Sequence, residues 1–468
     1  MHQPKTGSLV LILIASLLLL IPGTCRGEEI SVGLAQRQET LSVSSSSPIS
    51  VADGGGKKIL SGTSLVFRST GAGTVSAGTK RLRPPLLLSA RSPLAFNGRK
   101  YRGSFRIIAQ DGGISLSNVL DVEEYLRGVL KMEVDPAWPM EALKAQAVAS
   151  RTFALRSKRQ NNGKAGHDLG DTMFSQVYGG MNAEDPRTDR AISATKNEVA
   201  LYGGVPAFTP FHSDSGGSTA DVATVWGGTL PYLRAVKEPF PVSSPNSAWE
   251  TRLSASQVER ALREAGADVG TLRELRVVQS DSFGRPSTLL AIGSRGQQSL
   301  KSHAFRMAIG SRTLRSTNFT INSPSQPKPA VSSLPEAAPE AKKALPAKPI
   351  PTSDTPMSLA EERQLTTLTQ QGAFDAEELM DMLMNPAKRK GYLIQALRSP
   401  RKAGAKGISQ SPAPVSGTGG NGEFHFRGKG WGHGVGMSQW GAKTLAEQGW
   451  DYRKILQFYY QGISLGRM

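Results

Sequence analysis

Short apolar runs separated by turn-forming residues dominate the first quarter of the chain. These runs lie at 30–34, 63–68, 102–109 and 114–116, with Gly, Asp and Asn between them. Short runs bounded by such residues are typical of β-strands. We therefore predict a β-rich segment over residues 28–120. The Ser- and Gly-rich stretch 37–58 interrupts the pattern, and we expect a loop or an inserted turn there.

The apolar spacing changes to a helical period after residue 120. Over 121–133, Tyr125, Leu126, Val129, Leu130 and Glu133 fall on one side of the predicted helix. Asp121 and Glu124 have the spacing of a capping box. The 136–139 stretch ends this helix, and Pro139 suits the first turn of a second helix over 141–156. Arg151 points the same way as the apolar face of that second helix.

The rest of the chain alternates between short elements and loose segments. Strands and active-site loops are expected over 160–240, with apolar pieces at 199–202, 207–211 and 230–236. Helices are predicted at 255–266 and 302–309, and strands at 272–279 and 287–293. Helices are also predicted from 358 onward and near 375–383, 438–448 and 452–460, with a basic stretch at 388–406. Residues 323–358 are rich in Pro, Ala, Ser and Lys, a composition that cannot bury a core.

These elements predict an α+β fold with a β-rich core and two adjacent helices over about 121–156. One domain, 28–321 with 423–468, is interrupted by a low-complexity insertion, 322–422, that is partly disordered and carries short helices. The C-terminal part is too small to hold a core by itself, so it should pack on the first part. Two separate domains are the alternative.

The N-terminus has the pattern of a secretory signal peptide. Lys5 precedes an apolar run at 9–21, and small residues follow as far as Gly27. That run is shorter than the roughly 20 residues of a membrane-spanning helix. We expect cleavage after residues 1–27 and export to the periplasm or cell envelope. An uncleaved segment, or one lipidated at Cys25, is the alternative and would tether the protein to the membrane.

Charge and cysteine usage limit the partners. The net charge is +18, which attracts polyanions. An exported protein does not meet nucleic acid as its normal partner, so anionic envelope polymers are the expected partners. The alternative is that the positive charge is a generally basic, solvated surface with no specific partner. Cys25 is the single cysteine, which excludes a disulfide within the chain and a zinc site built from cysteines.

Three segments carry candidate chemistry. Glu133 on an apolar helix face would lose hydration, which raises a carboxyl pKa and favours a proton donor at neutral pH; exposure to solvent or an ion pair with Arg151 is the alternative. His212 follows a short apolar run and is followed by Ser213; a general base, a metal ligand and a structural histidine all fit it. The segment 430–442 combines many glycines with two tryptophans, as sugar-binding surfaces do. It lacks the Lys-Ser/Thr ending of a phosphate-binding loop.

Five stretches together resemble the stage II sporulation protein D and amidase-enhancer family of cell-wall proteins. They are 122–155, 175–180 (SQVYGG), 211–236, 314–321 and 426–442 (FRGKGWGHGVGMSQWGA). The resemblance covers most of 29–321 and 423–468. It implies a lytic transglycosylase activity on peptidoglycan glycan strands, with peptide-free strands preferred.

The resemblance also implies a catalytic residue and a mechanism. Glu133 matches the family's catalytic acid/base. It would protonate the leaving glycosidic oxygen and then help the muramoyl C6 hydroxyl attack the anomeric carbon, which gives a 1,6-anhydro end. From residue type and position in the matching stretches, we infer glycan contacts at Lys131, Trp138, Gln146, Arg151, Tyr178, His212, Ser213, His433 and Gln439.

Two departures and one alternative accompany the resemblance. Some family members carry a Cys/His zinc cluster just before the QVYGG stretch, but residues 167–176 contain no Cys here. We therefore predict that the family zinc site is lost and that the protein uses no cofactor. The insertion 322–422 is the second departure. The alternative function is a glycan-binding, non-catalytic activator of a cell-wall amidase, in which Glu133 would serve binding.

Overall fold

The computed structural model describes residues 27–71, 73–110, 112–161, 166–170, 176–322, 389–398 and 423–468, together with the single residues 361, 364, 365, 368 and 382. The predicted signal peptide, nearly all of the predicted insertion and its short helices before residue 389 lie outside the described residues. Within them, no helix is both long and apolar enough to cross a bilayer.

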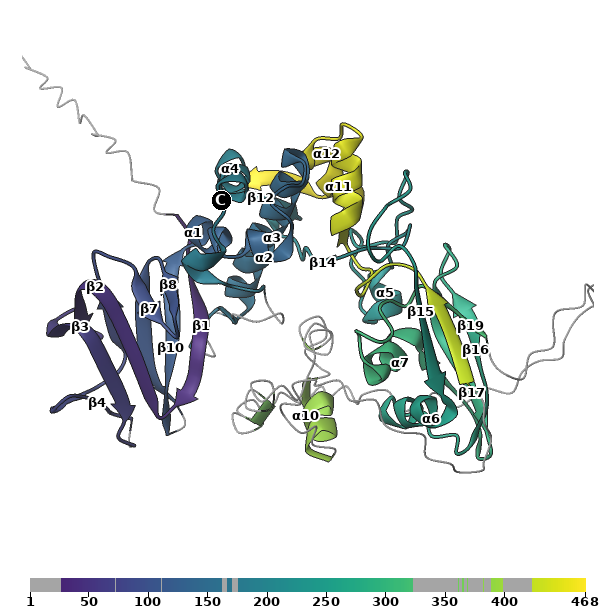
Figure 1. The fold of residues 1–468 in the computed structure, drawn as a ribbon, viewed down its shortest axis with the longest axis horizontal. Coiled ribbons are helices and arrows are strands. Elements are labelled where there is room, and N and C mark those ends of the chain that lie inside the picture. Colours follow the sequence, from purple (N-terminus) through teal and green to yellow (C-terminus); the bar gives the residue numbers. More distant parts are fainter. Residues whose placement is uncertain are drawn as a thin grey trace, which may run out of the picture.

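The N-terminal segment forms one large, mainly antiparallel sheet (Figure 1). Its spatial order is β11 (Leu169–Gly170), β1 (Glu29–Gln38), β10 (Gly113–Asp121), β9 (Ser104–Gln110), β6 (Leu86–Ser89), β2 (Thr40–Ala52), β3 (Lys58–Ser69), β4 (Val75–Ala77) and β5 (Lys80–Leu82). Two further strands, β7 (Leu94–Phe96) and β8 (Arg99–Tyr101), extend it from β2. The predicted β-rich segment is therefore confirmed.

The loop predicted at 37–58 is wrong. Most of that stretch is strand β2, thirteen residues long and paired with β3, β6 and β7. Leu41, Val43, Ile49 and Val51 are buried, with mostly serines alternating between them. This is the two-residue period of a half-buried strand, which the serine-rich composition hides.

The helices sit against one end of this sheet. They are α1 (Val122–Arg127), α2 (Leu130–Glu133), α3 (Met140–Asn161) and α4 (Pro186–Ala194). The first predicted helix is broken in two at Gly128, whose N–H bonds the Tyr125 carbonyl. Asp121 caps α1 through the Glu123 N–H. Helix α3 begins one residue before its predicted start and is buried on almost every side. Helix α4 was not predicted.

A second, separate hydrophobic core lies in residues 249–319 with Phe424 and Phe426. It contains β15 (Trp249–Ser254), α6 (Ala255–Glu264), β16 (Leu272–Ser280), β17 (Pro286–Gly293), β18 (Gly296–Lys301), α7 (Ser302–Ile309), β19 (Phe319–Asn322) and β20 (Glu423–Gly428). We call it the second core. The larger core, formed by the N-terminal sheet and α1–α4 with buried residues of 199–236 and 435–463, is called the first core. The predicted helices at 255–266 and 302–309 and strands at 272–279 and 287–293 are confirmed.

The chain between α4 and β15 is mostly loop, and its buried apolar residues pack in the first core. It holds β12 (Glu198–Tyr202), β13 (Val205–Pro206), β14 (Phe211–His212) and α5 (Val222–Val225), and the short 3-10 helix η1 (Gly180–Ala183) precedes α4. The piece at 199–202 is a strand as predicted, whereas 230–236 forms none.

Residues 423–468 pass through both cores. Strand β20 lies between β15 and β19 in the second core. The chain then pairs β21 (Met437–Ser438) with β14, places α11 (Gln439–Glu447) and α12 (Tyr452–Tyr459) near α3, and ends with β22 (Ser464–Arg467) on β12. The C-terminal part therefore packs on the first part of the chain. Figure 1 shows it in yellow in both halves.

Candidate active site

Glu133 is the last residue of α2, and its carboxyl is partly buried. The short helix closes when the Val134 N–H bonds the Leu130 carbonyl, and the chain turns to extended backbone at Val134. The Val177 backbone N–H donates to Oε1 of Glu133 at 3.3 Å. Among the described residues, the hydrogen bond to this carboxyl group comes from the main chain.

Burial raises the pKa of Glu133 to about 7, and the Val177 N–H lowers it by less. No charged group among the described residues contributes to this shift. The possible ion pair with Arg151 does not form, because the Arg151 guanidinium binds both carboxylate oxygens of Glu123 at 2.7 and 2.8 Å. A carboxyl group in this state is protonated about half the time near pH 7 and can give or take a proton.

The segment that carries Val177 is fixed by three contacts, two with α1 and its C-terminal end and one with β10. The Gly179 N–H donates to the Gly128 carbonyl at 2.9 Å. Tyr125 donates its hydroxyl to Gln176 at 3.0 Å, and the Tyr178 hydroxyl donates to Asn118 at 2.7 Å. A Cβ at Gly128 would lie 2.5 Å from the Tyr178 ring, so only glycine allows this close approach.

The C-terminal segment reaches Glu133 through Gln439. The Gln439 side-chain amide donates to the Glu133 carbonyl at 3.2 Å and to the Gln146 side chain at 3.5 Å. Gln146 donates in turn to Ser150. Residues more than 290 positions apart in sequence therefore meet at the end of α2, as expected if Glu133 and the glycine-rich segment share one site.

An aromatic pair lies beside this contact. Trp138 and Trp440 meet edge to face with ring centroids 5.1 Å apart. The backbone N–H of Trp440 donates to the Ser213 carbonyl at 3.0 Å, which connects α11 to the chain after β14. Trp440 is partly exposed and was not predicted individually, although it stands in the glycine-rich motif; its contact with Trp138 has no signal in the spacing.

His212 and His433, the latter within the glycine-rich segment, form a second cluster. Their ring centroids are 5.4 Å apart, and His433 also packs on Trp226. Nδ1 of His212 bonds the Val435 carbonyl, and Nε2 of His433 bonds the Phe211 carbonyl. Burial, with His433 and Arg285 nearby, holds the pKa of His212 well below its usual value. His212 is therefore a neutral, buried ring.

Arg151 and Tyr178 do not fit their predicted contacts with glycan. The Arg151 side chain is fully buried, and each of its three guanidinium nitrogens bonds within the protein. Tyr178 is 1% exposed, and its hydroxyl bonds Asn118. We assign both a structural role: Arg151 joins α1, α3 and α4, and Tyr178 supports the segment that carries Val177. Gln146 is also buried and positions Gln439.

Lys131 and Ser213 keep side chains that a ligand could reach. Lys131 is exposed on α2, two residues before Glu133, and the Ser213 side chain is partly exposed. Within the described ranges, no three His, Cys, Asp or Glu side chains are grouped so that they could hold a metal ion. In the region before the QVYGG stretch, His167 bonds Gln36 and Asp168 accepts from Ser31.

Comparison with known proteins places Glu133 in a matched segment. Residues 110–202 match the family model described as Stage II sporulation protein. An uncharacterised protein of Brachyspira hyodysenteriae is 29% identical over 236 residues, which are 50% of this chain and 63% of that protein.

Two Bacillus subtilis proteins match over shorter stretches. The amidase enhancer is 35% identical over 134 residues, 29% of this chain and 17% of that protein. Stage II sporulation protein D is 30% identical over 162 residues, 32% of this chain and 47% of that protein. The chain spans less than two thirds of the length of each of these relatives.

Proposed function

This chain belongs to the stage II sporulation protein D and amidase-enhancer family, and on that premise we propose that it is an exported lytic transglycosylase acting on peptidoglycan glycan strands. The observation that carries the proposal is the state of Glu133. Its pKa of about 7 makes a proton available at neutral pH, and no second carboxylate is bonded to it among the described residues.

The proposed reaction uses Glu133 twice. Protonated Glu133 gives its proton to the glycosidic oxygen as the bond from the anomeric carbon to that oxygen breaks. The resulting carboxylate then takes the proton of the muramoyl C6 hydroxyl while O6 forms a bond to the anomeric carbon. Glu133 ends protonated, no water is consumed, and the product carries a 1,6-anhydro ring. The usual two-carboxylate glycosidases instead need a second acid as nucleophile or base.

The surroundings of Glu133 suit both steps. The Val177 N–H at 3.3 Å stabilises the carboxylate formed in the first step. Gln439 fixes the end of α2 through the Glu133 carbonyl, so the side chain starts from a set position. Lys131, Trp138, Ser213, His433 and Gln439 are the proposed glycan-contacting residues. Peptide-free strands are the proposed substrate, and no metal or other cofactor is proposed.

A non-catalytic activator of a cell-wall amidase is the second candidate. It is favoured by the 35% identity to the amidase enhancer of Bacillus subtilis. In such a protein the same groups would bind glycan without cleaving it. A further proposed set of partners, the anionic polymers of the envelope, follows from the net charge of +18.

Incubation of purified protein with peptide-free glycan strands, followed by mass spectrometry for anhydro-muramoyl ends, tests the proposal. We expect wild type to form these ends and Glu133→Gln to lose at least about 100-fold of the rate, the usual contribution of a general acid. Glu264→Gln is the matched control, because Glu264 is an exposed acid at the end of α6, a helix that packs on the second core.

The alternative function predicts a different result. If neither wild type nor Glu133→Gln forms anhydro ends, and both accelerate an added amidase, the protein is an activator. Equal rates of anhydro-end formation by wild type and Glu133→Gln would refute the mechanism while leaving a transglycosylase with another acid.

A further inference from the structure

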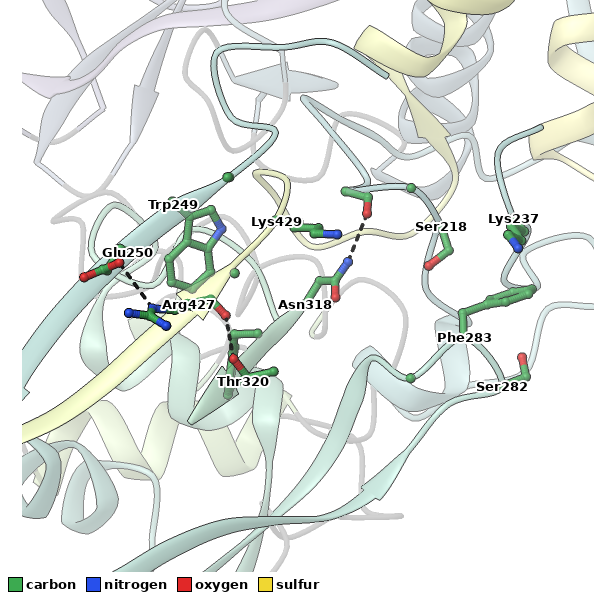
Figure 2. Close-up of a pocket in the computed structure, with 16 residues that line it drawn as sticks. Ser218, Lys237, Trp249, Glu250, Ser282, Phe283, Asn318, Thr320, Arg427 and Lys429 are labelled. Carbon is green, nitrogen blue, oxygen red and sulfur yellow. Dashed lines mark hydrogen bonds and ion pairs between the residues drawn. The ribbon is translucent and has the colours of Figure 1, made fainter. Parts of the chain in front are cut away.

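A cavity of about 1000 Å³ lies at the edge of the second core, away from Glu133 (Figure 2). Five separate stretches of chain and Lys237 line it: 216–218, 248–250 at the start of β15, 282–284 in the turn before β17, 318–320 at the start of β19, and 427–429 at the end of β20. This volume is that of a small-molecule site. Its lining residues are different from those that contact Glu133.

Hydrogen bonds between these stretches hold the cavity in shape. Buried Arg285, just after the 282–284 turn, donates to the carbonyls of Ser215 and Ser218 at 2.6 Å each. Asn318 donates its side-chain amide to the Gly216 carbonyl at 3.3 Å, and its own carbonyl accepts the Lys429 N–H at 2.9 Å. The walls are therefore joined before any ligand arrives, which lowers the entropy lost on binding.

Positive charge predominates in the cavity. Lys237, Arg427 and Lys429 line it, against one acid, Glu250. Glu250 already has basic partners, since it accepts from Arg427 at 3.3 Å and also pairs with His425. Lys237 and Lys429 are exposed and form no ion pair with any described acid. Figure 2 shows the side chains of Lys429 and Lys237 in the upper part of the view, above Thr320 and Ser282.

The remaining lining groups suit a sugar. Phe283 is 41% exposed, so its ring can cover an apolar sugar face. The turn that carries it is preset, because Asp281 accepts the N–H groups of both Phe283 and Arg285. The side chains of Ser218, Ser282 and Thr320 add groups that can bond hydroxyls.

We propose that this cavity binds an anionic saccharide, a sugar that carries a carboxylate or a phosphate. Lys237 and Lys429 would hold the anion, and the Phe283 ring would pack on the sugar. A peptide-free muramoyl sugar has such a carboxylate on its lactyl group, and phosphate-linked envelope polymers supply the phosphate version. The site adds a second point of glycan attachment to the proposed function, and its binding does not depend on cleavage by Glu133.

Isothermal titration calorimetry of the purified protein tests the site. The probes are N-acetylmuramic acid, glucose 6-phosphate and neutral N-acetylglucosamine. We expect one or both anionic sugars to bind and the neutral sugar to bind at least about tenfold more weakly. Lys237→Gln and Lys429→Gln should each lower the affinity for the anionic sugar by roughly three- to fivefold, as is usual for partly exposed charges. The double variant and a rise from low to moderate salt should weaken it further.

Matched variants separate the parts of the proposal. Lys196→Gln removes the same charge from an exposed position just after α4, outside the cavity lining, and should leave binding unchanged. Phe283→Ala should weaken the binding of each anionic sugar that wild type binds, but not the binding of inorganic phosphate or acetate. The proposal is overturned if Lys196→Gln weakens binding as much as the cavity lysines do. It is also overturned if acetate and inorganic phosphate bind as tightly as the sugars.

The two functional proposals fail separately. Glu133→Gln should bind the anionic sugars as wild type does. If no anhydro ends form but lysine-dependent sugar binding persists, the transglycosylase proposal is wrong and the cavity proposal stands. If anhydro ends form but neither anionic sugar shows lysine-dependent binding, the cavity proposal is wrong and the transglycosylase proposal stands.

Discussion

The state of a single carboxyl group determines what Glu133 can do. Since its pKa is raised to about 7 by burial, the acid form persists at pH values where ordinary glutamates are ionised. This residue was singled out from helical spacing and from the family motif. The spacing gave an apolar face, but the Val177 N–H that contacts the carboxyl comes from a segment 44 positions away.

The rate of glycan cleavage should follow the protonation of Glu133. If the proton donor is the group with a pKa of about 7, kcat/KM should be flat at lower pH and fall tenfold per pH unit above 7. Because the mechanism uses one carboxyl group, kcat/KM should not rise between pH 5 and 7, as it would if a carboxylate nucleophile had to ionise. Initial rates of anhydro-end formation from pH 5 to 9 measure this. A rate that rises through pH 7 would contradict the role as acid.

The free energy of unfolding should depend on pH through Glu133. A salt-bridged acid makes a protein more stable as pH rises, whereas Glu133 should make it less stable. The folded pKa is about 7, against 4.5 as the ordinary value, so folded protein binds the extra proton between these values. Stability is therefore lost as pH rises from about 4.5 through 7. Glu133→Gln should unfold with a free energy about 2–3 kcal/mol higher than wild type at pH 8, and equal to it at pH 4.

Urea unfolding of both proteins at the two pH values measures this difference. Glu264→Gln is again the control and should not differ from wild type by more than about 0.5 kcal/mol at either pH. If Glu133→Gln is destabilised at pH 8, Glu133 has a stabilising partner when ionised, and the argument for its raised pKa is wrong.

At the scale of elements, the sequence predicted helices and ordinary strands well and loops poorly. Strand β2 was missed because its alternating residues are small serines, and α4 because a glycine-rich region was expected to form strands and loops. Arg151 shows the same limit for side chains. Its place on the apolar face of α3 was correct, but its partner Glu123 is on another helix and cannot be read from spacing.

The glycine-rich segment before α11 depends on close backbone contact at Gly436. A Cβ there would lie 2.1 Å from the Pro210 carbonyl oxygen, and φ is +73°. Gly449, after α11, has φ of +82° and nothing within 4 Å. Alanine at Gly449 should therefore cost only the left-handed backbone, about 1 kcal/mol. Alanine at Gly436 adds the clash and should cost about 2–4 kcal/mol.

Thermal unfolding of the two alanine variants distinguishes these costs. Gly436→Ala should also slow glycan cleavage, because the shift reaches Met437 and the β14–β21 pair just before Gln439. Similar losses of stability in both variants would mean that the segment moves easily away from Pro210, and would remove the reason for a fixed Gln439.

At the scale of the whole molecule, the two ends of the predicted insertion meet. Strand β19 ends at Asn322, which pairs with His425 on antiparallel β20. Residues 323–422 thus leave and re-enter the second core at neighbouring positions. The α+β class was predictable from the elements. The second core and its cavity were not, because they bring together stretches that lie more than 200 residues apart.

Replacing residues 323–422 by a four-residue turn should therefore leave the fold intact. Closing a shorter loop loses less entropy, so stability should be unchanged or raised by up to about 3 kcal/mol, at roughly 0.6 kcal/mol per halving of loop length. Circular dichroism and urea unfolding check this. The chain cut after residue 422 is the contrasting variant, because it lacks β20 and α11, and should not fold. A deletion variant that unfolds would show that the second core needs residues 323–422.

The passage of the last residues through both cores has a consequence for the order of folding. A chain made from its N-terminus lacks the middle strand of the β15–β20–β19 sheet until residue 428 is available. It also lacks the helices that cover α3 until residue 459. Each core is therefore completed only when the last part of the chain has been made, and the contacts that complete it span hundreds of residues, which slows folding.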